Sequence, residues 1–215
     1  MKIKSLLLIL MLCIPLLVYA KDRPTNELPM YGGKHNPAVE QNKAFSASAA
    51  KLAWQYYYRG DLDTAIKRFN QAWMFDRDSI DALWGFGLIM GRRASEELPE
   101  YHLKESIRFL DMAFKKSPAN ARIIVDLAMS QTLFASYLKA KSDANAQQEF
   151  LKAISLFEAA AGHDNKYPLL HANWSVLEFY MGNYLKAQER LEQAKKLGFQ
   201  PDPAYVKDIE NKLKK

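Results

Sequence analysis

Apolar residues recur at three- and four-residue spacing from Ala38 almost to the end of the chain. This is the period of one face of an α-helix, and no convincing alternation of the kind typical of a half-buried strand interrupts it. Turn-forming residues divide the pattern at Gly60-Asp61, 76–79, Pro99, Ser117-Pro118, 162–168, Gly182-Asn183 and 198–203. The sequence therefore predicts an all-α protein of about nine helices, the first of them beginning at Asn36-Pro37.

One motif of small and large residues occurs four times. In each copy a small residue is followed four positions later by a large apolar one and three positions after that by another small one. The copies are Ala65-Phe69-Ala72, Ser106-Leu110-Ala113, Ala153-Phe157-Ala160 and Ala187-Leu191-Ala194. Further small residues stand fifteen positions after the first three copies, at Gly87, Ala128 and Ser175, and Ala53 holds the equivalent place before the first copy. Small residues in phase predict helices that cross closely.

This pattern resembles the tetratricopeptide repeat, a helix-turn-helix unit of about 34 residues. The first copy is near-complete, with Leu52-Ala53, Tyr56, Gly60-Asp61, Ala65, Phe69 and Ala72. The resemblance covers about residues 46–200 and implies a right-handed superhelical solenoid of about four repeats, at 46–79, 80–120, 121–167 and 168–201. Residues 202–215, with Tyr205, Ile209 and Leu213 at four-residue spacing, are expected to form a C-terminal cap helix.

Two of the repeats depart from the family's length. The step across the inner turn is 12 residues in the first and fourth repeats but 19 and 25 in the second and third. The additional residues lie near 92–101 and 137–146 and must either lengthen the helices or add loops. The repeat-ending proline is also present only once, as Pro118.

The first twenty residues have the features of an export signal. Lys2 and Lys4 precede the apolar run Leu6–Val18, which is too short to span a bilayer, and Val18-Tyr19-Ala20 suits a signal peptidase. Residues 1–20 are thus predicted to be a cleaved signal peptide. Cys13 follows the large Leu12 inside the run, which disfavours lipidation, and after cleavage the chain has no cysteine.

Residues 21–45 are expected to form a flexible N-terminal arm and the start of the first helix. The arm is polar and rich in turn signals, apart from the apolar patch 28–31. That patch either packs against the chain's own body or is bound by a partner.

The net charge of +6 falls to +4 when Lys2 and Lys4 are removed, and the excess is scattered along the chain. A nucleic-acid-binding protein concentrates its positive charge on one stripe. The basic balance is therefore expected to be a solvated surface, and no nucleic-acid partner is predicted.

The tetratricopeptide resemblance implies a partner-binding groove lined by the first helix of each repeat. Carried over to this sequence, the groove positions give an apolar and aromatic surface with one acid and one base: Trp54, Tyr57, Asp81, Trp84, Leu88, Arg122, Met129, Val176 and Phe179. The two tryptophans either anchor a partner segment or belong to the core, or are covered by the arm. Aromatic anchors at interface centres typically carry much of the binding energy.

Motifs for catalysis or for a cofactor are weak. His163 and His171 lack paired metal-ligand spacing, and the sequence has no GxSxG, GxGxxG or Walker loop. No cofactor or metal is expected. The predicted function is a non-enzymatic adaptor, monomeric or weakly oligomeric, that binds another envelope protein in the periplasm or, alternatively, in the medium. The alternative function is an assembly or structural subunit of a membrane-associated envelope complex.

Overall fold

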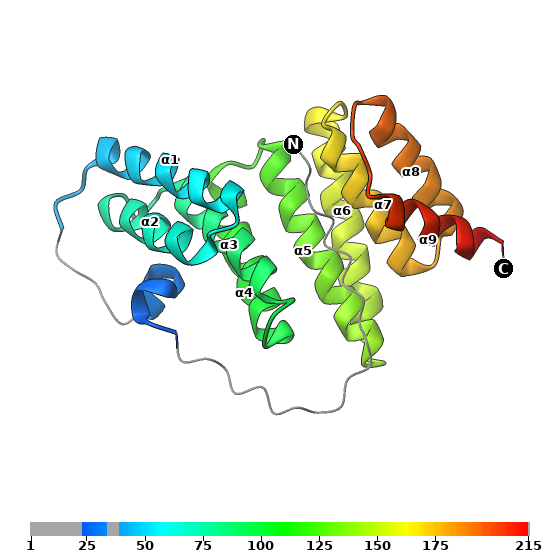
Figure 1. Ribbon diagram of the computed structural model, residues 1–215, viewed down its shortest axis with the longest axis horizontal. Helices are drawn as coiled ribbons and strands as arrows, with labels where there is room; N and C mark the ends of the chain where they lie inside the picture. The colour runs from blue at the N-terminus through cyan, green and yellow to red at the C-terminus, as the bar shows by residue number, and fades with distance from the viewer. Residues whose placement is uncertain (1–22, 34–38, 215) are drawn as a thin grey trace. The chain divides into compact units, whose positions relative to one another are not determined.

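The computed structural model describes residues 23–33 and 39–214, which divide into two compact units, 23–118 and 119–214 (Figure 1). The described residues of the first unit form two 3-10 segments, η1 (Thr25–Glu27) and η2 (Pro29–Gly33), and helices α1 (Lys43–Arg59), α2 (Leu62–Phe75), α3 (Ile80–Arg93) and α4 (Pro99–Lys116). Those of the second form α5 (Ala121–Ala140), α6 (Ala146–Asp164), α7 (Pro168–Met181), α8 (Tyr184–Lys196) and α9 (Pro203–Leu213). The predicted all-α class is confirmed.

The helices of each unit pair in sequence as antiparallel hairpins, α1 with α2, α3 with α4, α5 with α6 and α7 with α8. Local sequence sets the turn of the first hairpin. Gly60 adopts φ 86°, a left-handed conformation that ends α1, and the Asp61 side chain then accepts the backbone N–H of Thr64 to start α2. Helix α1 begins at Lys43, before the predicted first repeat at 46–79, and the other helices of these hairpins lie within the predicted repeat bounds.

The predicted start of the first helix is wrong. Helix α1 begins at Lys43, because the side chain of Asn42 accepts the backbone N–H groups of Ala44 and Phe45. Residues 39–42 are not helical, and Asn36-Pro37 lies outside the described residues. Asn42 is fixed at this position by a tertiary contact, since its own N–H is bonded to the Phe75 carbonyl at the end of α2.

The small residues of the repeated motif lie where helices cross. All twelve are buried, and the large residues between them, Phe69, Leu110, Phe157 and Leu191, are at most 2% exposed. Glycine is required at two crossings. A Cβ on Gly85 would lie 2.3 Å from the ring of Phe69, and one on Gly87 would lie 2.5 Å from Leu110 Cγ. The spacing motif therefore marks close helix approach, as its sequence predicted.

The extra residues of the third repeat lengthen its helices. Helices α5 and α6 have 20 and 19 residues, whereas α7 and α8 have 14 and 13. In the second repeat the extra length is divided between the 18-residue α4 and the connection 94–98. Leu98 closes that connection with φ 40°.

Helix α9 packs on the last hairpin. Tyr205 and Ile209 form a buried cluster with Ala187 and Leu191 of α8, and Leu213 packs against its edge. Tyr205, Ile209 and Leu213 stand at four-residue spacing, which places them on one face of α9. The apolar stripe predicted for the C-terminal helix is the stripe that covers α8.

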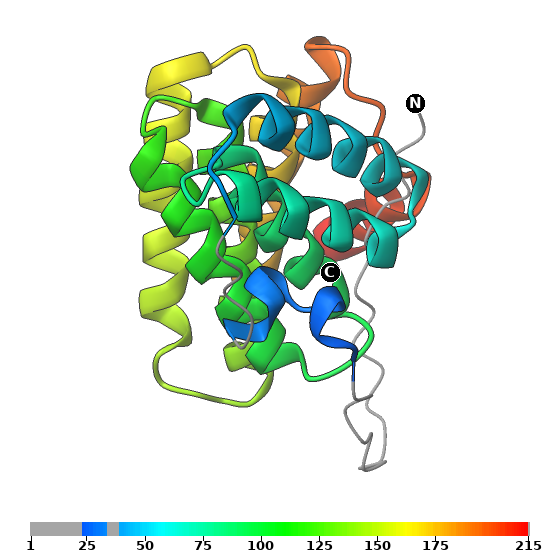
Figure 2. The same cartoon turned by 90° about the vertical axis from the view of Figure 1, so that its left-hand side faces the viewer.

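Segments η1 and η2 lie along α2, on its side away from α1 (Figures 1 and 2). Their backbone is irregular, with Met30 and Tyr31 at φ 52° and 54°. None of the residues 23–33 is fully buried. We call residues 23–33 the arm, and it is held against α2 mainly by polar contacts that are described below.

Candidate functional site

Four aromatic side chains gather where α1 packs beside α3. Trp54 is at their centre, with its ring centroid 5.1 Å from Trp84, 5.7 Å from Tyr57 and 5.9 Å from Tyr58. The indole of Trp54 also meets buried Phe69 edge-on at 4.9 Å. We call Trp54, Tyr57, Tyr58 and Trp84 the aromatic cluster. Trp54 meets Tyr57 and Trp84 edge-to-face and stacks on Tyr58, and these contacts fix the ring orientations, so the cluster is a preformed surface.

The aromatic cluster is neither core nor fully exposed. Trp54, Tyr57 and Trp84 are half-buried, and Tyr58 is 68% exposed. Of the predicted groove residues beside them, Leu88 is half-buried and Asp81 is exposed. The structure brings the predicted groove residues Trp54, Tyr57, Asp81 and Trp84 together. Tyr58, which extends the cluster outward, was not among the predicted residues.

Two charged residues border the cluster on α3. Asp81, in the first turn, accepts the indole N–H of Trp54 at 2.8 Å. Arg92, in the last turn, places its guanidinium 5.8 Å from the centre of the Tyr57 ring. Eleven residues of helix separate the two, which is about 16 Å at 1.5 Å per residue. The cluster therefore has an acidic end and a basic end.

The other four predicted groove residues lie in the second unit, and three of them have partners within it. Val176 and Phe179 pack against the cluster that α9 forms with α8, and the Phe179 ring lies 5.6 Å from that of Tyr205. Arg122 is exposed, with its guanidinium 5.6 Å from the Tyr167 ring, and Met129 is half-buried. Part of the surface assigned to partner binding in this unit is thus covered by the C-terminal helix.

A second set of contacts, which the sequence analysis did not predict, holds the arm against helices α1–α4, which we call the body. Asn70 of α2 is fully buried, and its Nδ2 donates to the carbonyls of Asn26 and Leu28 at 2.9 and 2.8 Å. Its Oδ1 accepts the backbone N–H of Tyr31 at 3.4 Å. Arg93, which is 1% exposed, donates to the Glu27 carbonyl at 2.7 Å. Two side chains of the body thereby satisfy four backbone groups of the arm.

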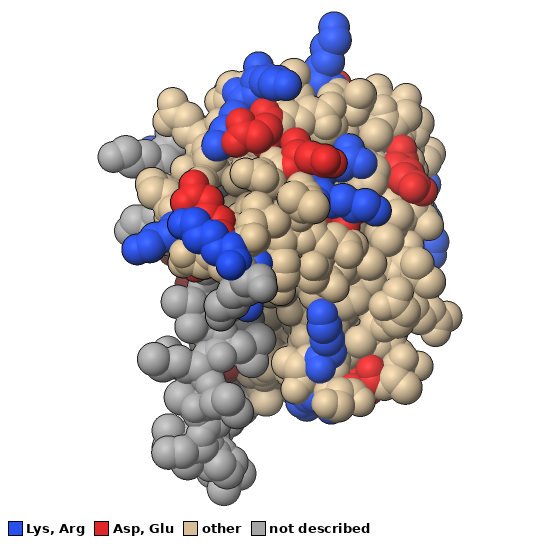
Figure 3. Space-filling model, turned by 90° about the vertical axis from the view of Figure 1, so that its right-hand side faces the viewer, with Lys and Arg blue, Asp and Glu red and all other residues tan. Residues whose placement is uncertain are grey.

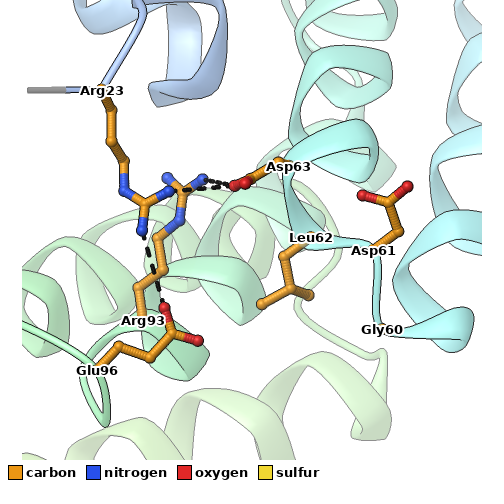
Figure 4. A pocket seen from close by; sticks show the side chains of 7 residues that line it. All are labelled: Arg23, Gly60, Asp61, Leu62, Asp63, Arg93 and Glu96. Atoms are coloured by element: carbon orange, nitrogen blue, oxygen red, sulfur yellow. Dashed lines mark hydrogen bonds and ion pairs between the residues drawn. The ribbon is translucent and has the colours of Figure 1, made fainter. Parts of the chain in front are cut away.

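Arg23 is the main charged contact of the arm. Its Nε donates to Glu97 at 3.0 Å and its Nη1 to Asp63 at 3.1 Å, while Glu96 lies 3.8 Å from Nη2. Arg93 binds the same Asp63 carboxylate at 3.0 Å. A small pocket of about 220 Å³ opens beside these groups, next to the α1–α2 turn (Figure 4). Burial lowers the pKa of the Arg93 guanidinium, as does the nearby Arg23 charge.

The sequence does carry a signal for this site, although a weak one. Asn70 is a polar residue inside the buried stripe of α2, between Phe69 and Ala72, and Arg93 follows an apolar run that is buried almost throughout. Buried polar groups require partners. That rule predicts that each has a partner, but it does not say that the partner is a segment more than 40 residues away.

The histidines do not form a metal site among the described residues, where no group of three potential ligands converges. His171 is fully buried and its Nε2 lies 2.8 Å from the Asn165 carbonyl, whereas His163 is exposed. His102 is buried 3.7 Å from Glu97. Burial lowers the pKa of His102, with Arg93 and Arg23 acting in the same direction and Glu97 opposing them.

Charges of both signs alternate on the described surface. On the face drawn in Figure 3, basic side chains are separated by acidic and uncharged ones. Many pair along one helix, for example Lys104 with Glu100 and Lys195 with Glu192. Such pairs suit a solvated surface.

Within residues 23–33 and 39–214, no helix combines the length and the apolar character needed to cross a membrane.

Comparison with known proteins identifies the fold. No protein-family model matches the sequence, and no curated protein matches it either. Among solved structures, the chain is similar to a thermophilic tetratricopeptide-repeat protein from Thermus thermophilus, with a TM-score of 0.62 and 17% identity over 71% of this chain and 74% of that one. The fold is therefore tetratricopeptide-like, as the repeated motif indicated.

Proposed function

We propose that this protein is a non-enzymatic adaptor whose first unit binds an apolar or amphipathic segment of another protein on the aromatic cluster. The observation that carries the proposal is a set of preorganised aromatic rings around Trp54 that are only partly buried, with Tyr58 exposed. Large apolar surfaces left in contact with water are typical of interaction sites. Rigid aromatic rings also lose little conformational entropy on binding.

The charges at the two ends of the cluster describe the partner more closely. Asp81 and Arg92 are about 16 Å apart along α3, which is the length of three helical turns. An amphipathic helix with apolar anchors on one face, a basic residue near Asp81 and an acidic residue near Arg92 matches this arrangement. The Asp81 carboxylate is exposed and holds the Trp54 indole with one oxygen, so its second oxygen can accept a further bond.

The proposed setting is the cell envelope, and the periplasm of a two-membrane bacterium in particular. This rests on residues 1–20, whose basic start and short apolar run are typical of a cleaved export signal. Mass spectrometry of the protein isolated from cells tests it directly. A chain beginning at Lys21 supports export, and an intact N-terminus contradicts it.

The binding proposal is tested by a photo-crosslinking amino acid in place of Tyr57 in cells that express the protein. We expect one discrete protein adduct, identified by mass spectrometry. The matched control carries the same amino acid at Tyr101, an aromatic residue of α4 that is 52% exposed and lies outside the cluster.

Two outcomes would contradict the proposal. Equal adducts from the two positions would mean that capture depends on exposure alone. Adducts confined to the chain's own residues 21–36 would mean that this N-terminal segment, and not another protein, occupies the surface in cells.

A further inference from the structure

The arm is held by the body in the way that a bound peptide is held. Asn70 and Arg93 contact the arm through its backbone, at the carbonyls of Asn26, Glu27 and Leu28. Backbone contacts of this kind hold a chain whatever its side chains are. Specificity comes from charged side chains of the arm. Arg23 bridges Asp63 on α2 and Glu97 after α3, and Glu27 pairs with Lys67 of α2 at 3.0 Å.

The arm contributes little to the hydrophobic core. Its apolar residues Leu28, Pro29, Met30 and Tyr31 are all half-buried. Met30 and Tyr31 also adopt left-handed backbone conformations, which are unfavourable for residues other than glycine. A segment with shallow apolar burial and a strained backbone is held weakly compared with a core helix.

The body, in contrast, presents polar groups at this surface whose hydrogen bonds the arm completes. With the arm in place, Asn70 is fully buried and Arg93 nearly so, and both donate hydrogen bonds to carbonyls of the arm. Leaving such groups unpaired is costly. The surface therefore favours occupation, and the chemistry it recognises is a turn-forming peptide with an arginine before the turn.

From these contacts we propose that the surface formed by Asp63, Asn70, Arg93 and Glu97 is a peptide-binding site, distinct from the aromatic cluster, that holds residues 23–31 as a reversible ligand. Covalent attachment gives such a segment an effective concentration on the order of millimolar. A segment whose intrinsic Kd is tens of micromolar would then be bound in nearly all molecules, yet it would exchange with a competing peptide.

The test separates the arm from the body after the protein has folded. In the protein that begins at Lys21, a protease site replaces residues 34–38, and Thr25→Cys carries a fluorophore at an exposed position of the arm. After cleavage, unlabelled synthetic peptide 21–33 is added and fluorescence anisotropy is followed. We expect half of the labelled arm to be displaced by roughly 1–100 μM peptide while the helical circular dichroism stays constant.

Peptide variants establish whether the contacts seen are the ones that bind. An Arg23→Ala peptide is expected to reach the same displacement only at a concentration at least about tenfold higher, because the ion pairs of Arg23 with Asp63, Glu96 and Glu97 are lost. An Arg23→Lys peptide should be intermediate, since one ammonium cannot bridge two carboxylates as a guanidinium does. A Thr25→Ala peptide is the matched control and should compete like the native one.

Three results would overturn the proposal. The labelled arm could remain bound in excess peptide until urea unfolds the helices, or cleavage itself could abolish the helical signal; in both cases the arm is part of the folded core. The arm could also leave on cleavage without the peptide ever rebinding. A body variant, Asn70→Asp, gives an independent test, because it keeps the shape and the Oδ1 acceptor but removes both donated bonds.

Discussion

The hydroxyl of Ser106 on α4 donates a hydrogen bond of 2.7 Å to the carbonyl of Gly87 on α3. The last hairpin has the same contact in the opposite direction, since Ser175 on α7 donates to the carbonyl of Ala187 on α8, also at 2.7 Å. In both hairpins the serine is one of the in-phase small residues. A hydroxyl is small enough for the crossing and adds a hydrogen bond to the neighbouring backbone.

Replacing Gly87 with alanine is expected to destabilise the first unit by about 1–3 kcal/mol, the usual cost of overpacking. The added Cβ would lie 2.5 Å from Leu110 Cγ and 3.1 Å from the Ser106 carbonyl oxygen. Leu110 is fully buried and cannot swing away, and the carbonyl belongs to α4. Urea denaturation followed by circular dichroism measures the change.

The matched control is Gly162→Ala. Gly162 also lies in a helix, but a Cβ there would have nothing within 4 Å. Alanine is the better helix former by up to about 1 kcal/mol, so this variant should be as stable as the native protein or more so. Equal destabilisation by both substitutions would mean that the crossing at Gly87 is not tightly packed.

The fold could be predicted because its determinants are local and periodic. The positions of Ala65, Phe69 and Ala72 on one helix, and of Gly87 fifteen residues later, follow from a helix period and a fixed turn. The start of α1 at Lys43 was not predicted, because its N-cap, Asn42, is positioned by a hydrogen bond to the Phe75 carbonyl of another helix.

Only part of the candidate site could be predicted in the same way. Trp54 and Trp84 are both groove positions in the first helices of adjacent repeats, so the family pattern places them on one surface. The contact of Asn70 with the arm has no such pattern, because it joins a helix to an irregular segment 42 and 44 residues away. Likewise, the covering of Val176 and Phe179 by α9 depends on how a non-repeat helix packs.

Trp84→Ala should weaken partner binding by at least about 2 kcal/mol, or roughly 30-fold in Kd, if Trp84 is a central anchor. Its effect on folding should be smaller than the roughly 3–5 kcal/mol typical of a fully buried tryptophan, because the side chain is half-buried. Binding is measured by titration with the partner protein that the photo-crosslinking experiment identifies, and stability is measured by urea denaturation.

Phe86→Leu provides the contrast for Trp84→Ala. Phe86 lies two residues further along α3 but is fully buried, with its ring 5.3 Å from that of Phe109. The Phe86→Leu variant should have a lower free energy of unfolding, and its folded molecules should bind the partner with native affinity. If Trp84→Ala gave this same result, the aromatic cluster would be core rather than a binding surface.

Stability should fall as the pH decreases through the ordinary pKa of histidine. The folded protein lowers the pKa of buried His102 below its usual 6.5. The unfolded chain therefore takes up a proton first, and the folded state loses stability below about pH 6.5, by at most about 1.4 kcal/mol per pH unit for one proton. Urea denaturation at about pH 7.5 and pH 5.5 measures the loss.

Two variants isolate the contribution of His102 from that of the carboxylates that titrate in the same range. His102→Phe keeps an aromatic ring at 5.1 Å from Tyr101 but cannot bind a proton, so it should reduce the pH dependence. His163→Gln changes an exposed histidine and should leave it as in the native protein. An unchanged pH dependence in His102→Phe would show that His102 is not the group responsible.

The attachment of α9 depends on a hydrogen-bonded pair at the centre of the last hairpin. Ser175 Oγ lies 2.9 Å from the hydroxyl of Tyr205 and already donates its only proton to the Ala187 carbonyl, so Tyr205 must be the donor. Burial raises the pKa of the Tyr205 phenol, which keeps the proton in place. Tyr205→Phe should cost about 1 kcal/mol, the loss of one neutral hydrogen bond.

Ile209→Ala should cost more, about 2–5 kcal/mol, because it leaves a cavity beside Leu191. If α9 then detaches, Val176 and Phe179 become exposed and the variant should bind a hydrophobic dye that the native protein does not. The comparison variant is Leu185→Ala, which removes a leucine of α8 that is 67% exposed and should change neither stability nor dye binding. Equal behaviour of the two variants would mean that α9 does not cover the α7 surface in solution.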